Sequence, residues 1–166
     1  MPHKKLEDYA AEILPGLFEV EDFTRIYKSL QEHDPRFKDV TPDSFGMEFL
    51  CLRLALACKA WEKTCEENQI KDEAAKKILL KRVMNSFQSP KFLKMATTFS
   101  AYLYSKNAVE HPEIGLPEQL FKNLNMETCK KNSVKEEPGD AFQLLVGICS
   151  SLRNSFENEF FEVLTK

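Results

Sequence analysis

The sequence predicts an all-α domain, a single helical bundle or orthogonally packed set of about six or seven helices around a long central helix near residues 42–68. Apolar residues recur at spacings of three and four in several segments, as in amphipathic helices. Alternation of polar and apolar residues nowhere coincides with turn dipeptides, so no strand is predicted. The 166 residues fit a single domain over residues 1–166, and the 13 phenylalanines predict a bulky core.

The first third of the chain predicts two helices before the long one. A short helix is expected over residues 4–13 and should end at Pro15-Gly16. A second helix is expected over residues 19–32, where apolar side chains recur on one helix face: Phe23, Ile26, Tyr27 and Leu30. A loop should follow over residues 35–40.

The long helix has a strong start signal in Thr41-Pro42-Asp43. Threonine is a good N-cap, proline is favoured at the first helical position, and an acid in the first turn complements the helix dipole. The first half of this helix is apolar almost all round, which indicates that neighbours cover it on several sides. Its apolar residues are Phe45, Met47, Phe49, Leu50, Leu52, Leu54, Leu56 and Trp61.

Three shorter helices are expected next. Asp72 can cap a helix that reaches Phe87, and Ser89-Pro90 repeats the cap-and-proline start for a helix to Leu103. Residues 107–115 are expected to form a loop. A short helix should then run from Pro117 to Leu124.

A polar segment precedes the last helix. Residues 125–139 are rich in lysine and glutamate and have little to bury, so a mobile linker is predicted there. The C-terminal helix is expected over residues 140–164. Its apolar residues form a heptad seam, widened by Ile148 and Phe160: Phe142, Leu145, Cys149, Leu152, Phe156 and Val163.

Five cysteines without a CxxC pair indicate reduced thiols rather than a disulfide framework. Cys51, Cys58 and Cys65 repeat every seven residues, so consecutive thiols lie roughly 10.5 Å apart along one helix face. That spacing is too long for a disulfide or for one tetrahedral zinc ion. These three side chains are therefore expected to be buried, whereas Cys129 in the linker is expected to be an exposed thiol.

No residue is predicted to be catalytic or to bind a cofactor or a metal. The three histidines, His3, His33 and His111, lie near a terminus or in expected loops, and none has a second ligand at helical spacing. The sequence contains neither GxxxxGKS/T nor GxGxxG, the motifs whose backbone holds phosphates. These absences favour a non-enzymatic role.

The charge pattern predicts neither nucleic-acid binding nor a membrane span. The net charge is −3, and residues 71–94 have the largest local charge, with seven basic and two acidic residues. These basic side chains point in different directions around a helix, so solvated helix flanks are the favoured interpretation. No apolar run approaches ~20 residues, and the N-terminal residues lack a signal-peptide pattern, so a cytoplasmic protein is expected.

Two charged residues interrupt apolar stripes and are the candidate site residues. Arg53 lies at the margin of the apolar face of the long helix, whose middle includes Trp61, and Glu159 occupies a seam position on the last helix. Because a buried charge is costly unless it is paired, the favoured interpretation is an ion pair between Arg53 and Glu159, or an Arg53 side chain that extends its charged end to the surface. The alternative is a phenylalanine-lined pocket in which Arg53 binds an anionic group.

The sequence favours a non-enzymatic protein-interaction or adaptor domain that contacts another protein or a second copy of the chain. The long amphipathic helices could serve partners in this way. The alternatives are a helical domain that binds a small apolar or amphipathic ligand, such as an anionic one, and an enzyme of unrecognised type. A broad exposed apolar patch would favour the protein partner.

Overall fold

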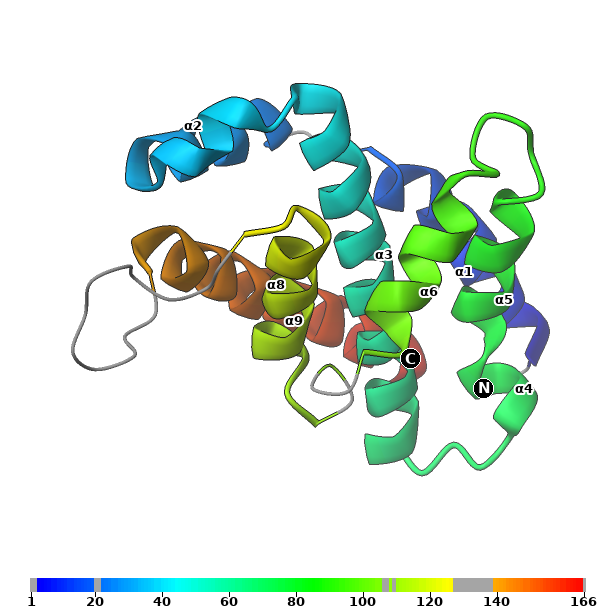
Figure 1. Ribbon diagram of the computed structural model, residues 1–166. Helices are drawn as coiled ribbons and strands as arrows, with labels where there is room; N and C mark the ends of the chain where they lie inside the picture. Colours follow the sequence, from blue (N-terminus) through cyan, green and yellow to red (C-terminus); the bar gives the residue numbers. More distant parts are fainter. Residues whose placement is uncertain (1–2, 20–21, 106–107, 109, 127–138, 166) are drawn as a thin grey trace.

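The computed structural model describes the chain except for residues 1–2, 20–21, 106–107, 109, 127–138 and 166 (Figure 1). The described residues contain α-helices, one 3-10 helix and no strand, which confirms the predicted all-α fold class. The elements are α1 (His3–Leu17), α2 (Phe23–His33), the 3-10 helix η1 (Pro35–Asp39), α3 (Pro42–Glu67), α4 (Glu73–Lys76), α5 (Ile78–Ser86), α6 (Met95–Leu103), α8 (Pro112–Asn123) and α9 (Asp140–Thr165).

The predicted central helix is confirmed as α3. It runs through the middle of the molecule, with α1, α5 and α6 on one side and α8 and α9 on the other (Figure 1). The Thr41 hydroxyl oxygen accepts a hydrogen bond from the Ser44 amide at 3.1 Å, and Pro42 occupies the first helical position. Neighbouring helices bury side chains all round α3, as its apolar sequence requires.

The first helix is longer than predicted, because Pro15 does not end it. α1 continues to Leu17 with Pro15 inside its last turns. A proline so close to the C-terminal end removes one amide donor but leaves the preceding turns intact. The helix ends through tighter bonds, from Phe18 N to the Pro15 oxygen and from Glu19 N to the Gly16 oxygen, both at 3.2 Å.

Several other boundaries also differ from the predicted ones. The helix expected over residues 72–87 is divided at Lys77 into α4 and α5. α2 begins at Phe23, and α6 begins at Met95 rather than at the predicted proline start. The predicted loop before α3 contains η1, whose Phe37 side chain is buried.

The start of α8 corrects the prediction of a loop over residues 107–115. The helix begins at Pro112, and Pro117 lies inside it. The His111 carbonyl oxygen accepts hydrogen bonds from the amides of Ile114 at 3.0 Å and Gly115 at 2.8 Å. Pro112 was the better start signal, because it occupies a position whose amide has no helical partner in any case.

Aromatic rings form much of the core, as the phenylalanine content predicts. Phe45 of α3 is central, with ring centroids 5.3 Å from Tyr27, 5.6 Å from Phe23, 5.7 Å from Phe49 and 6.1 Å from Phe37. These contacts join α2, η1 and α3. The network fixes α2 against the first half of α3, and α2 in turn lies beside α9.

The core also encloses one carboxylate. Glu48 of α3 is buried, and its Oε2 accepts hydrogen bonds from the Tyr102 hydroxyl at 2.5 Å and the Asn123 amide at 3.0 Å. The Gln119 amide donates to Asn123 at 2.7 Å. This network joins α3, α6 and α8 and supplies the partners that a buried carboxylate needs.

Candidate functional site

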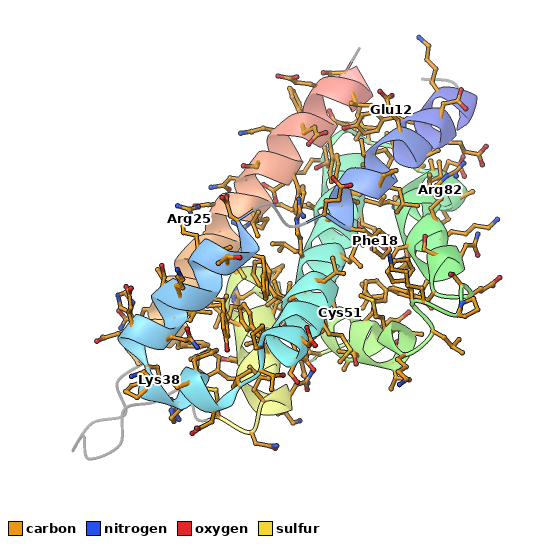
Figure 2. The ribbon with its side chains drawn as sticks, turned by 90° about the horizontal axis from the view of Figure 1, so that it is seen from above. Glu12, Phe18, Arg25, Lys38, Cys51 and Arg82 are labelled. Atoms are coloured by element: carbon orange, nitrogen blue, oxygen red, sulfur yellow. The ribbon has the colours of Figure 1, made fainter. Side chains whose placement is uncertain are left out.

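A groove of about 690 Å³ lies between α2 and α9 and is here called the α2–α9 groove. Figure 2 shows α2 beside α9, with Arg25 at their boundary. The groove is lined from α2 by Asp22, Arg25, Ile26 and Ser29. From α9 it is lined by Gln143, Leu144, Gly147, Ile148, Ser151 and Leu152.

The apolar floor of the groove follows from the spacing of α9 residues. Leu144, Ile148 and Leu152 recur every four residues, so they form one stripe along the helix. All three are half-buried, and Ile26 of α2 faces them across the groove. The sequence placed Leu152 in the heptad seam, with Ile148 widening it, whereas the structure leaves both side chains bordering the groove.

Gly147 is an exposed position in the groove wall. A Cβ atom built on Gly147 would have nothing within 4 Å. A glycine inside a helix costs roughly 1 kcal/mol relative to alanine, so its presence in the middle of α9 is not explained by helix stability. Packing inside the chain does not require it either. The glycine leaves the α9 backbone accessible from the groove.

A second hollow, of about 330 Å³, extends the groove toward the end of α1. It shares Asp22, Ile26 and Leu152 with the α2–α9 groove, and Arg53 lies in its lining. Arg53 is therefore near a cavity, as one of the two sequence interpretations expected. The question is what its guanidinium group contacts.

Arg53 binds backbone carbonyl groups at the end of α1. Its Nη1 donates to the Leu17 oxygen at 3.4 Å and to the Glu19 oxygen. Carbonyl groups at a helix C-terminus lack helical partners and attract a cation, so Arg53 stabilises the end of α1. The favoured ion pair with Glu159 is not formed: Glu159 is exposed, and its Oε1 accepts a hydrogen bond from the Tyr9 hydroxyl at 2.8 Å.

Trp61 belongs to the core rather than to a pocket. Its side chain is fully buried, and its Nε1 donates to the Ala75 oxygen at 3.0 Å. Its ring lies 6.2 Å from that of Tyr9 and 5.2 Å from that of Phe160. Tyr9 contacts both Glu159 and Trp61, whereas Arg53 binds the end of α1, so the three residues do not form one site.

The cysteines of α3 are buried, as predicted. Cys51, Cys58, Cys65 and Cys149 are free thiols. Burial raises the pKa of Cys51 to about 12 and that of Cys65 to about 11. These thiols are therefore protonated at neutral pH and poor nucleophiles. Cys129, the predicted exposed thiol, lies outside the described residues, as does most of the predicted linker.

A groove of about 340 Å³ between α3 and α9 is the main alternative site. Its lining is charged, and several of these charges form ion pairs that join neighbouring helices. Arg153 binds Glu113 at 2.5 Å, and Lys63 binds Glu157 at 2.9 Å. Lys59 also lines it, with a pKa lowered chiefly by burial. Because its ion pairs already join α3, α8 and α9, this groove is better explained as an interhelical contact.

The basic segment is partly paired inside the chain, since Lys77 binds Glu62 of α3 at 2.7 Å. Within the described ranges, no group of histidine, cysteine, aspartate and glutamate side chains could hold a metal ion. Among the helices described, none is long and apolar enough to cross a membrane.

Comparisons of the chain with protein-family models, with curated proteins and with solved structures find no match. What the α2–α9 groove can bind is therefore inferred from its own residues.

Proposed function

We propose that this chain is a non-enzymatic interaction domain that binds an apolar helical segment of a partner protein in the α2–α9 groove. The observation that carries the proposal is the groove itself, with an apolar floor and an uncovered Gly147 in its wall. Helix-in-groove recognition uses such a surface, because an amphipathic helix places its apolar side chains on the floor.

The small residues of α9 favour a helical occupant. Gly147 and Ser151 are exposed and four residues apart, so they occupy the same side of the helix. Small side chains at this spacing allow the backbone of a second helix to approach closely. The residues that line the groove on α9 extend over ten positions, from Gln143 to Leu152, which is roughly 14 Å of helix. This length accommodates two to three turns of a partner.

The rim of the groove favours a partner with uncharged flanks. Asp22 and Arg25 pair with each other at 3.2 Å and largely cancel each other's charge. Ser29, Gln143 and Ser151 add uncharged polar groups. A strongly acidic or basic peptide would therefore gain little here, whereas an apolar stripe edged by polar residues is complementary to both floor and rim.

A small anionic ligand has weaker support as an occupant. The sequence interpretation relied on Arg53 as the anchor for such a ligand. The Arg53 guanidinium group instead donates to the carbonyl groups of Leu17 and Glu19. An anion at Arg53 would share the guanidinium group with these contacts, which hold the end of α1.

A peptide-display selection on the whole protein tests the proposal. We expect enriched peptides with apolar residues at i, i+3 or i+4, and i+7. Gly147→Leu places a large side chain in the groove, at a position where the added Cβ atom has nothing within 4 Å, and should weaken binding at least tenfold. Asn158→Leu is the matched control, because this exposed residue lies on the same side of α9, about three turns beyond Gly147.

Peptides that bind wild type and Gly147→Leu equally, or a selection without this apolar spacing, would overturn the proposal. Sedimentation of the protein alone separates a second copy from another protein as the occupant. A dimer that Gly147→Leu dissociates would identify the partner helix as one of this chain.

A further inference from the structure

The stretch of sequence between Glu73 and Glu110 differs in charge from the rest of the chain. Residues 74–109 contain seven basic residues and no acid, although acids outnumber basic residues in the whole chain by 26 to 23. Lys76 and Lys77 pair with Glu73 and Glu62, but the net charge of −3 still conceals a positive stretch that includes the exposed Lys81, Lys91 and Lys94. Salt screens charges beyond the Debye length, which is about 10 Å. Such a positive stretch therefore attracts an anionic surface that comes this close, regardless of the total charge of the chain.

The same segment exposes apolar side chains. The large hydrophobic residues exposed in the described part of the chain are Met84, Leu93, Tyr104, Ile114 and Phe161. The first three belong to the acid-free segment. Exposed apolar and basic side chains thus occur together, a combination that a solvated helix flank does not need.

The connection between α5 and α6, residues 87–94, brings both kinds of side chain to one tip. Figure 1 shows this connection standing out from the helices at the upper right. Leu93 is 62% exposed at the tip, and the exposed side chains of Lys91 and Lys94 lie on either side of it in sequence. Lys81 is exposed on the preceding helix.

The body of the molecule holds this tip in place. The Phe92 ring lies 5.0 Å from the Phe18 ring, which in turn contacts the Phe87 ring at 6.4 Å. Turn hydrogen bonds run from Phe92 N to the Ser89 oxygen at 3.0 Å and from Met95 N to the Phe92 oxygen at 2.9 Å. Because Phe92 anchors the connection, Leu93 is presented to solvent without a further ordering cost.

We infer that the tip at residues 87–94 binds the surface of an anionic lipid bilayer. Leu93 enters the acyl boundary, and Lys91 and Lys94 contact phosphate and carboxylate groups of the lipid headgroups. Lysine can extend its charged end into the headgroup layer while its methylene chain follows an apolar side chain inward. One inserted leucine binds weakly, so the basic residues supply the second signal that stable attachment requires.

The arrangement favours a bilayer over nucleic acid. A nucleic acid would use the lysines but would leave Leu93 in water, and the aromatic ring between these lysines, Phe92, is half-buried and packs against Phe18. A bilayer uses both the charge and the apolar side chain. Each basic residue near an anionic membrane strengthens binding roughly fivefold.

Vesicle co-sedimentation of the full chain tests this inference. Vesicles of phosphatidylcholine with about one third phosphatidylserine should bind the protein, and pure phosphatidylcholine vesicles should bind it at least tenfold more weakly. Leu93→Ser and the double variant Lys91→Ala/Lys94→Ala should each reduce binding about tenfold or more. Exposed residues elsewhere supply the controls, Phe161→Ser and Lys28→Ala/Lys38→Ala, and these should bind like wild type.

A second measurement follows insertion directly. Leu93→Trp adds an exposed tryptophan to a chain whose own Trp61 is buried. Its emission should shift to shorter wavelength with phosphatidylserine vesicles and not with phosphatidylcholine vesicles. Absence of vesicle binding, equal binding to both compositions, an equal loss in the control variants, or an unshifted emission would overturn the inference.

Discussion

The two longest helices, α3 and α9, are each 26 residues long, yet the chain covers them differently. Fourteen residues of α3 are buried, against six of α9. The difference is not one of length or helix propensity. It reflects position, since α3 has neighbours on several sides and α9 has one face toward α2 that remains open.

The glycines of these helices show the same contrast. A Cβ atom on Gly46 of α3 would contact the Phe23 ring at 3.4 Å, whereas a Cβ atom on Gly147 of α9 would contact nothing within 4 Å. Packing inside the chain therefore explains a small residue at position 46 but not at position 147. An uncovered helix face in an otherwise packed molecule is a surface available to a partner.

Removing a large side chain should show the strongest contrast in stability between α3 and α9. Trp61→Ala removes a fully buried ring and a hydrogen bond from α3, and it should lower the free energy of unfolding by about 3–5 kcal/mol. Leu144→Ala in α9 removes a half-buried side chain at the groove and should cost about 1 kcal/mol or less. Urea unfolding followed by far-ultraviolet circular dichroism measures both. Equal losses would mean that α9 is as covered as α3.

Substitution of Arg53 tests how the end of α1 is held against α3. Arg53→Met removes the donor to the Leu17 and Glu19 carbonyl groups and should destabilise by about 2 kcal/mol. Adding Glu159→Gln should not restore the loss, because Glu159 binds Tyr9 instead. Urea unfolding of the single and double variants measures the coupling. A recovery in the double variant would reinstate the ion pair favoured from sequence.

Thiol ionisation tests the burial of α3 without changing its packing. The pKa values of Cys51 and Cys65 are raised to about 12 and about 11 in the folded chain, against about 8.5 when unfolded. The folded chain keeps protons that the unfolded chain releases. The contribution of these thiols to the free energy of unfolding is fully present below about pH 8.5. It is lost as the pH rises through the pKa values that the thiols have in the folded chain.

Between about pH 9 and about pH 10.5, ionisation of each of these thiols in the unfolded chain should therefore lower the free energy of unfolding by up to about 1.4 kcal/mol per pH unit. The variant Cys51→Ala/Cys65→Ala should show a shallower pH dependence over this range under reducing conditions. Identical slopes in variant and wild type would show that these thiols are not the buried groups that titrate.

The smallest expected effect is a gain in the free energy of unfolding. Gly147→Ala should raise the free energy of unfolding by about 0.5–1 kcal/mol, because alanine is the better helix former and the position is open. Gly46→Ala should gain less, since its new methyl group would contact Phe23. Paired urea unfolding curves separate these changes. A destabilising Gly147→Ala would show that the groove wall is covered.

Local sequence signals predicted much of the fold. Thr41 and Pro42 mark the start of α3, and the all-round apolar pattern identified it as central, because capping and helix periodicity are local properties. Proline residues predicted the ends and starts of helices less well. Pro15 and Pro117 both lie within helices, since each removes only one amide donor and neighbouring turns compensate.

Contacts between helices could not be predicted in the same way. The partners of Arg53 are backbone carbonyl groups at the end of α1, and nothing in residue type distinguishes these from a carboxylate on α9. The groove depends on how far apart α2 and α9 pack, which periodicity does not contain. One signal was available, namely a glycine in the middle of a strongly helical segment, which costs stability unless something requires it.

The most direct test of the groove as a binding site is methyl nuclear magnetic resonance of the protein titrated with a display-selected peptide. Shifts should concentrate on the methyl groups of Ile26, Leu144, Ile148 and Leu152, which line the groove. Methyl groups of Leu54 in the covered helix α3 should move little. Largest shifts outside the groove, at Leu93 or Ile114 for example, would contradict the assignment of α2 and α9 as the binding surface.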